Sequence, residues 1–120
     1  MIEASTPNGR KLKLDDQNGL IEISDGTNNM HMNSSATHIW RRDNHISITD
    51  QSIHSWHNDY HVLVDNNQVK LYSGNNAVRL GPDMISITHG TNIELSVGGS
   101  TVSLTQASID IQGTVIKLNS

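Results

Sequence analysis

Short triplets, in which an apolar residue is followed by any residue and then by a second apolar residue, recur about every eight positions along this chain of 120 residues. Twelve steps cover the 95 positions from the first triplet, at Ile21, to the last, at Ile116. The spacing between every second triplet, which we call the double step, is more regular than the single step. The triplets at Met30, Ile46 and Val62 follow one another at equal intervals. A unit this short buries no apolar face of its own and must stack on its neighbours.

The triplets predict strands. In most of them the flanking residues are aliphatic and the middle residue is polar, as in Val69-Lys70-Leu71 and Ile93-Glu94-Leu95. This period of two indicates a half-buried strand. Turn-forming residues such as Gly98-Gly99-Ser100 separate the triplets, and no segment has the pattern of an amphipathic helix. We therefore expect an all-β chain of short strands whose short and long connections alternate.

Composition excludes several classes of protein. Hydrophobic residues make up 34% of the chain, with no Phe, two Trp and two Tyr. These are too few large apolar side chains to fill a single globular core. The net charge of −4 argues against nucleic acid and anionic lipid as partners. Without Cys, the chain has neither disulfides nor a thiolate site. The sequence has no apolar stretch of membrane-spanning length and no recognisable signal peptide.

Strands and turns of three to five residues can build a meander, a single-chain solenoid or an intertwined trimer. A solenoid needs a longer coil, of roughly 18 to 25 residues. Two aliphatic side chains per strand and turn do not enclose a core from one chain, whereas three chains around one axis can each supply one face and pair their strand edges. We predict an intertwined homotrimeric triple-stranded β-helix, a β-prism needle roughly 60 Å long at about 4.8 Å per strand.

The aliphatic doublets are the candidates for side chains on the threefold axis. They flank the middle residue of each triplet, so both members point to the same side of the strand. The predicted axial residues are Ile46, Ile48, Val62, Val64, Val69, Leu71, Val78, Leu80, Ile85, Ile87, Ile93, Leu95, Val102, Leu104, Ile109 and Ile111.

Both ends of the chain resemble a known family. The segment 6–16, TPNGRKLKLDD, followed by Gly19 and Ile21-Glu22-Ile23, resembles the entry into the β-helical needle of VgrG-type spikes and contractile-phage baseplate central spikes. The segment 108–119 is similar to the last coils of the same needles. The resemblance covers essentially the whole chain. Its Thr-Pro-x-Gly…Asp-Asp entry is more distinctive than its Ile-x-Ile coils, which occur in many β-rods.

The resemblance implies a structural, membrane-puncturing spike of a contractile injection system, either a phage tail or a type VI secretion system. Residues 1–19 would form the entry segment and residues 20–120 the shaft, with irregular wider coils near 38–61. In the family, larger domains precede the needle, and none precedes Thr6 here. We therefore expect a needle fragment, or a very short spike, joined to the inner tube and baseplate through missing N-terminal domains. Its place would be the virion tail baseplate or a secreted, injected spike.

The resemblance also implies a partner at the tip. Some phage spikes end in a His-x-His apex that holds iron, but this sequence ends in Asn119-Ser120 without such a pair. In the family, a small PAAR-repeat protein completes a tip of this kind. We expect it to contact Ile116 and Leu118.

Seven His residues raise the question of a metal, since one inward His would supply three ligands on a threefold axis. His45 and His61 directly precede the aliphatic residues that begin their triplets, so in a strand we expect them to point outward, away from the axis. His89 shares the parity of Ile85 and Ile87 and is the one candidate for an axial ligand, although His89-Gly90 also has the pattern of a turn. We predict no bound metal or cofactor and keep a metal-loaded spike as an alternative.

Aromatic residues cluster where the repeat is interrupted, in the segments 39–45 and 53–61. Trp40, Trp56 and Tyr60 either form a bulge that grips a partner or lie on the outer surface of a widened coil, and we favour the second interpretation.

Catalysis has little support. The carboxylates are scattered over turns and outward positions, and neither a phosphate-binding loop nor a nucleophile elbow is present. We predict a protein that is not an enzyme. Two alternatives stay open: a passive trimeric fibre or receptor-binding shaft, and a single-chain β-solenoid that acts on polysaccharides.

Overall fold

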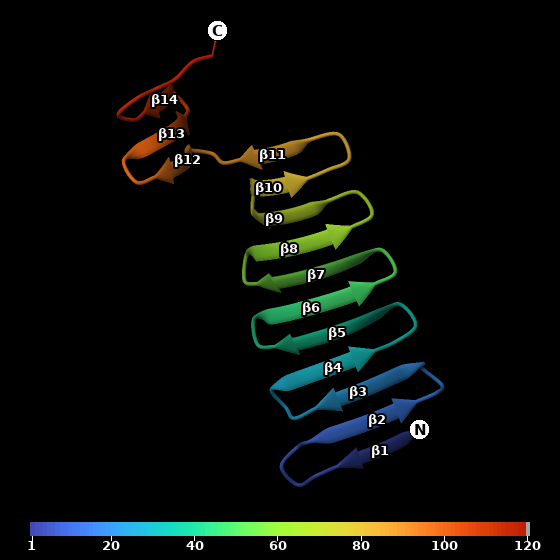
Figure 1. Ribbon diagram of the computed structural model, residues 1–120. Coiled ribbons are helices and arrows are strands. Elements are labelled where there is room, and N and C mark those ends of the chain that lie inside the picture. The colour runs from blue at the N-terminus through green and yellow to red at the C-terminus, as the bar shows by residue number, and fades with distance from the viewer. Residues whose placement is uncertain (120) are drawn as a thin grey trace.

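The computed structural model describes residues 1–119, and within this range every regular element is a β-strand. Fourteen strands follow one another along the chain like the rungs of a ladder (Figure 1). They are β1 (Ile2–Ser5), β2 (Lys11–Asp15), β3 (Leu20–Ser24), β4 (Asn28–Met32), β5 (Ala36–Arg41), β6 (Asn44–Thr49), β7 (Ser52–His57), β8 (Tyr60–Asp65), β9 (Val69–Ser73), β10 (Asn76–Leu80), β11 (Ile85–Thr88), β12 (Asn92–Val97), β13 (Ser100–Thr105) and β14 (Ile109–Gln112).

The topology is an antiparallel meander in two sheets. Strands β1 to β11 form one sheet in sequence order, and β12 to β14 form a second. Within each sheet a strand pairs with its neighbours in the chain, and the extents of the molecule are 72 × 33 × 22 Å. The all-β class and the elongated shape are confirmed. The strands of one chain thus pair with one another, and the intertwined trimer stays a prediction.

The register gives the sheet two chemically different faces. Val62 lies opposite Leu71, and Leu71 lies opposite Val78, so each aliphatic residue meets another across the strand pair. Residues directly opposite each other share a face of the sheet. The predicted doublets therefore share one side of their sheet, in the long sheet and in the short one, and we call this side the aliphatic face. The middle residues of the triplets form the polar face.

Turns of two kinds alternate from β4 onward, as the sequence predicts. On one side of the sheet, two-residue turns at 42–43, 58–59 and 74–75 begin with a positive φ, of 51° at Arg42, 51° at Asn58 and 57° at Gly74. On the other side, the turns begin with a side-chain acceptor at Asn33, Thr49 or Asp65, each one double step of the repeat after the last. The double step of the sequence repeat is thus the distance from one hairpin to the next.

The turn between β3 and β4 depends on a carboxylate. Asp25 Oδ1 accepts hydrogen bonds from the backbone amides of Asn28 (2.7 Å) and Thr27 (3.0 Å), and Oδ2 accepts one from the Asn28 side chain at 2.7 Å. These bonds, above all the one from the Asn28 amide, lower the pKa of Asp25 from 3.8 to about 2. The ionised form therefore stabilises the fold.

We expect Asp25→Ala to lower the urea midpoint of unfolding at pH 7, because the turn loses these acceptors. A lowered folded-state pKa contributes stability above the unfolded-state pKa and loses it as pH falls toward the folded-state value. The difference from the wild type should therefore shrink between pH 4 and about pH 2. Asp16→Ala, in the turn between β2 and β3, is the matched control and should have little effect. Equal losses in the two variants would contradict this role.

The pairing of successive strands is interrupted between β11 and β12. β11 ends at Thr88 and β12 begins at Asn92, and the two strands do not pair, so that β12 to β14 stand as a separate block at the end of the long sheet (Figure 1). The ring of His89 spans this joint, because its Nδ1 accepts hydrogen bonds from the backbone amides of Thr91 (3.1 Å) and Asn92 (3.3 Å). β1 and β2, from the predicted entry segment, belong to the long sheet.

The described residues contain no buried hydrophobic side chain. The one buried residue among them is Asp15, at 7% exposure, which accepts bonds from the backbone amide and the side chain of Asn18. Over residues 1–119, the chain alone therefore has strands and turns but no apolar core.

Candidate functional site

The aliphatic face is the most unusual surface of this chain. Val62 is 45% exposed, Leu71 49% and Ile85 73%. Of the sixteen predicted axial residues, only Ile93 and Val102 are half-buried, and the others are exposed. All sixteen lie on one side of their sheet, as their cross-strand partners show. Their position on a threefold axis stays a prediction.

The aliphatic face is more exposed than the polar face, which is the reverse of the usual order for a sheet. In β8, Val62 and Val64 are exposed, whereas His61 and Leu63 on the polar face are half-buried. Soluble antiparallel sheets usually cover their apolar face and leave the polar face to water. The aliphatic face thus has the composition of a core and the exposure of a surface.

The size of the uncovered surface can be judged from the accessible area. The chain exposes 9345 Å², whereas a compact monomer of 13.2 kDa exposes roughly 6,400 Å². The excess of roughly 2,900 Å² per chain exceeds what a standard protein–protein interface buries. This excess belongs to the whole extended chain, and the contiguous exposed aliphatic residues within it are typical of an interaction site.

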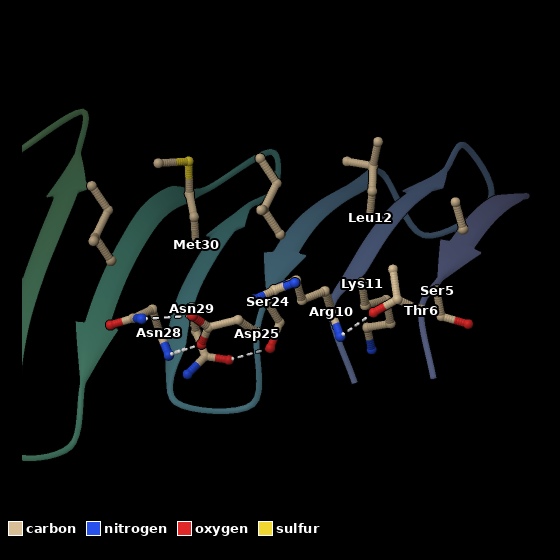
Figure 2. Close-up of a pocket in the computed structure, with 13 residues that line it drawn as sticks. Ser5, Thr6, Arg10, Lys11, Leu12, Ser24, Asp25, Asn28, Asn29 and Met30 are labelled. Atoms are coloured by element: carbon tan, nitrogen blue, oxygen red, sulfur yellow. Dashed lines mark hydrogen bonds between the residues drawn. The ribbon is translucent and has the colours of Figure 1, made fainter. Parts of the chain in front are cut away.

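The aliphatic face also extends further toward the N-terminus than the predicted axial set. Here the face is hollowed, with a volume of about 640 Å³ lined by Leu12, Ile23, Met30 and Ile39. Figure 2 shows Leu12 and Met30 projecting to the same side of the sheet, with polar turn residues such as Asp25 at its edge. The triplets that contain Ile23, Met30 and Ile39 were visible in the sequence but were not included in the axial set.

The predicted tip residues lie beyond the last strand. Ile116 is 52% exposed and Leu118 is 86% exposed, and both follow β14 in a segment without regular structure. They are accessible to a partner. Their contact with a cap protein stays a prediction.

A row of stacked rings crosses the polar face. We call Trp40, His45, Trp56, His61 and Tyr72 the aromatic ladder, with one ring from each of the strands β5 to β9. Successive ring centroids are 5.8, 4.1, 6.3 and 4.5 Å apart.

The ladder lies in strands whose pairing is regular, on the side of the sheet opposite the aliphatic face. Tyr60, which the sequence grouped with Trp40 and Trp56, has the parity of Val62 and lies on the aliphatic side, at 70% exposure. The structure thus separates Tyr60 from the two tryptophans.

Each histidine of the aromatic ladder forms a close pair with a second histidine outside it, and sequence analysis missed both pairs. His38 Nδ1 lies 3.2 Å from His45 Nε2, and His54 Nε2 lies 2.9 Å from His61 Nδ1. Burial, followed by the neighbouring imidazoles, lowers the pKa of His45 and of His54 below 6.5. The neutral form of these two imidazoles is therefore favoured.

The signal for these pairs was present in the sequence as two histidines on either side of a two-residue turn, where they become diagonal neighbours on one face: His38 lies opposite Ser47, and His45 lies opposite Trp40. The partners in each pair come from the two strands of one hairpin, so a prediction of the hairpin register would have brought them together.

His89 behaves as a turn residue, since its ring is engaged by the backbone at the joint between the sheets. Within residues 1–119, no group of three or more His, Cys, Asp or Glu side chains is placed to hold a metal ion. The carboxylates that were considered for catalysis sit mainly in turns or ion pairs, such as Glu22, whose Oε1 lies 2.7 Å from Lys11 Nζ. This ion-pair hydrogen bond lowers the pKa of Glu22.

A scan against models of protein families and a search of curated proteins find no match to this chain. Over the described part of the chain, no helix is long and apolar enough to cross a membrane. The function must therefore be inferred from the chain's own surfaces.

Proposed function

We propose that this chain is the needle of a homotrimeric, membrane-puncturing spike of a contractile injection system, a phage tail or a type VI secretion system. The observation that carries the proposal is the uncovered aliphatic face, which runs along an elongated sheet with no core of its own in the described residues. The likeness of segments 6–16 and 108–119 to spike needles adds the biological context.

Copies of the same chain are the best cover for this face. A partner must present an apolar stripe as long as the sheet and with the same strand spacing, and a second copy meets both conditions. Burying the excess area of roughly 2,900 Å² per chain would give an interface in the range of permanent oligomers. In such an assembly the aliphatic face becomes the core that a single chain lacks.

Three copies fit the width of the stripe better than two. In β6 the aliphatic pair Ile46 and Ile48 is preceded on the same face by Asn44, and the strand ends at Thr49, so the stripe is only two side chains wide. Three narrow stripes converge on a line and close a triangular prism. Two would form a sandwich whose apolar layer is open along both long sides.

The meander pairing changes the arrangement of the chains that we propose for the trimer. Because β1 to β11 pair within the chain, each chain can form one face of the prism over this length. β1, β11, β12 and β14 each have an edge that is unpaired within the described chain, and the last three adjoin or follow the joint between the two sheets. Unpaired edges invite strands from another chain. Intertwining of the three chains is therefore proposed for the region beyond Thr88.

The mechanical role follows from this architecture. A prism whose core runs its full length resists bending and local unfolding, because no chain can leave without exposing the aliphatic faces of the other two. Its outer surface carries the polar face, and three chains together carry −12, three times −4, which discourages self-association. The N-terminal end would face the inner tube and baseplate, and a PAAR-type protein would cover Ile116 and Leu118.

The first experiment measures the solution mass of the purified chain by light scattering, with imaging of the particles by electron microscopy. We expect narrow rods with three times the chain mass of 13.2 kDa. A folded species with the mass of a single chain would contradict the trimer, and one with twice that mass would replace it with a dimer.

The second experiment separates a spike from a passive fibre. A PAAR-type protein from the same genome should bind with one copy per three chains, and the double variant Ile116→Asp, Leu118→Asp should abolish binding while the mass stays unchanged. A trimer that binds no cap protein would contradict the spike and favour the fibre.

A further inference from the structure

The two histidine pairs on the polar face occupy equivalent positions in two successive hairpins, although the ring planes are 77° apart in His38–His45 and 24° apart in His54–His61. His38 and His54 are separated by one double step of the repeat, as are His45 and His61, so the repeat that builds the hairpins also duplicates the pairs. Each pair joins the two strands of one hairpin, β5 with β6 and β7 with β8. In both pairs a nitrogen of one ring faces a nitrogen of the other, at 3.2 and 2.9 Å.

This spacing is what two neighbouring ligands of one metal ion require. With metal–nitrogen bonds of about 2.0 to 2.1 Å, two imidazoles at a right angle place their nitrogens about 2.9 Å apart, and at a tetrahedral angle about 3.4 Å apart. The His54–His61 pair matches the first value, and the His38–His45 pair lies between the two. Square-planar and tetragonal geometry is typical of Cu²⁺ and Ni²⁺ with nitrogen ligands.

The chemistry of a neutral imidazole also suits a metal. A neutral imidazole carries one proton, which can reside on the nitrogen that faces away from the pair, leaving both inner nitrogens with free lone pairs. The ion then replaces the hydrogen bond within the pair, and both rings rotate so that their lone pairs converge on it.

The second pair has a third group nearby. Tyr72 Oη, from β9, lies 3.4 Å from His54 Nε2. A phenol oxygen at this distance can hydrogen-bond a water on the ion or approach the ion itself. The first pair has no such neighbour among the hydrogen bonds of His38 and His45 in the described chain.

We propose that each of the pairs His38–His45 and His54–His61 binds one divalent transition-metal ion, Cu²⁺ most tightly and Ni²⁺ next, with water in the remaining positions. Each ion would clip together the two strands of its hairpin. Because the pairs lie on the face opposite the aliphatic face, the sites do not depend on the proposed trimer.

The test is calorimetric titration of the purified wild-type protein with CuSO₄ and NiCl₂ at pH 7.5. We expect two Cu²⁺ ions per chain, tighter than Ni²⁺, and a rise in the thermal unfolding midpoint when Cu²⁺ is present. His38→Gln and His54→Gln should each reduce the number to one, and the double variant should bind none. Tyr72→Phe should weaken only the ion at His54–His61.

His31→Gln and His89→Gln are the matched controls, because they remove imidazoles outside the two pairs, and both should retain two ions. Circular dichroism before titration shows whether each variant retains its β-structure. Nitrogen splitting in the electron paramagnetic resonance spectrum should indicate two imidazoles per Cu²⁺. Absence of binding by the wild type, or a number of ions unchanged by the paired variants, would overturn the proposal.

Discussion

Val62→Asp is expected to abolish the assembled state, whereas Leu63→Asp, one residue further along β8, is expected to leave it intact. Val62 lies on the aliphatic face, where three copies would bring three carboxylates close to the axis. A charge buried without a partner is among the most destabilising of substitutions, on the order of 5 kcal/mol per chain. We expect monomeric, unfolded or aggregated protein in light scattering and circular dichroism.

Leu63 is the sharp control because it is the more buried residue in the single chain. Val62 is exposed at 45%, and Leu63 is half-buried on the polar face, directly opposite Lys70. A carboxylate opposite Lys70 gains an oppositely charged neighbour on the outer surface. If the single chain were the functional form, Leu63→Asp would be the more harmful of the two variants, and that outcome would contradict the proposed assembly.

Thermal stability is expected to depend strongly on protein concentration. When three folded chains are in equilibrium with three unfolded ones, a hundredfold rise in concentration stabilises the assembly by about 2 kcal/mol per chain. For a chain of this size the midpoint should rise by about 5 to 8 °C. Scanning calorimetry or circular dichroism over this concentration range checks the prediction, provided that refolding is reversible.

A monomer would show the same midpoint at every concentration. Val62→Asp provides the internal comparison, because any residual folded form of this variant should lose the concentration dependence. A constant midpoint in the wild type would contradict coupling of folding to assembly, whatever the shape of the single chain.

The strands could be predicted from the sequence because a period of two leaves little choice about which residues share a side. The alternation of turns was also predictable, since a repeat that is regular only at its double step requires two unlike connections. The partner of each strand was not predictable: a doublet such as Val78 and Leu80 fits an intertwined coil and a meander equally well. The choice depends on whether each turn reverses the chain, as the positive φ at Asn58 allows.

The joint between the two sheets and the histidine pairs were harder to find. Gly90 and its neighbours resemble other turns in composition, and nothing local indicates that pairing stops there. The proximity of His54 and His61 depends on register across a hairpin, which triplet spacing alone does not give. The exposure of the aliphatic face, in contrast, was implicit in a repeat with only two aliphatic residues per strand.

Pairing only between chain neighbours makes rod length an evolutionarily adjustable quantity. Because no strand of the long sheet pairs with a distant one, duplication or loss of one hairpin changes the length by two strand spacings, about 9.6 Å. The ends need not change when this happens. Duplication or deletion of a gene segment that encodes one hairpin therefore changes the rod length in steps of a single hairpin.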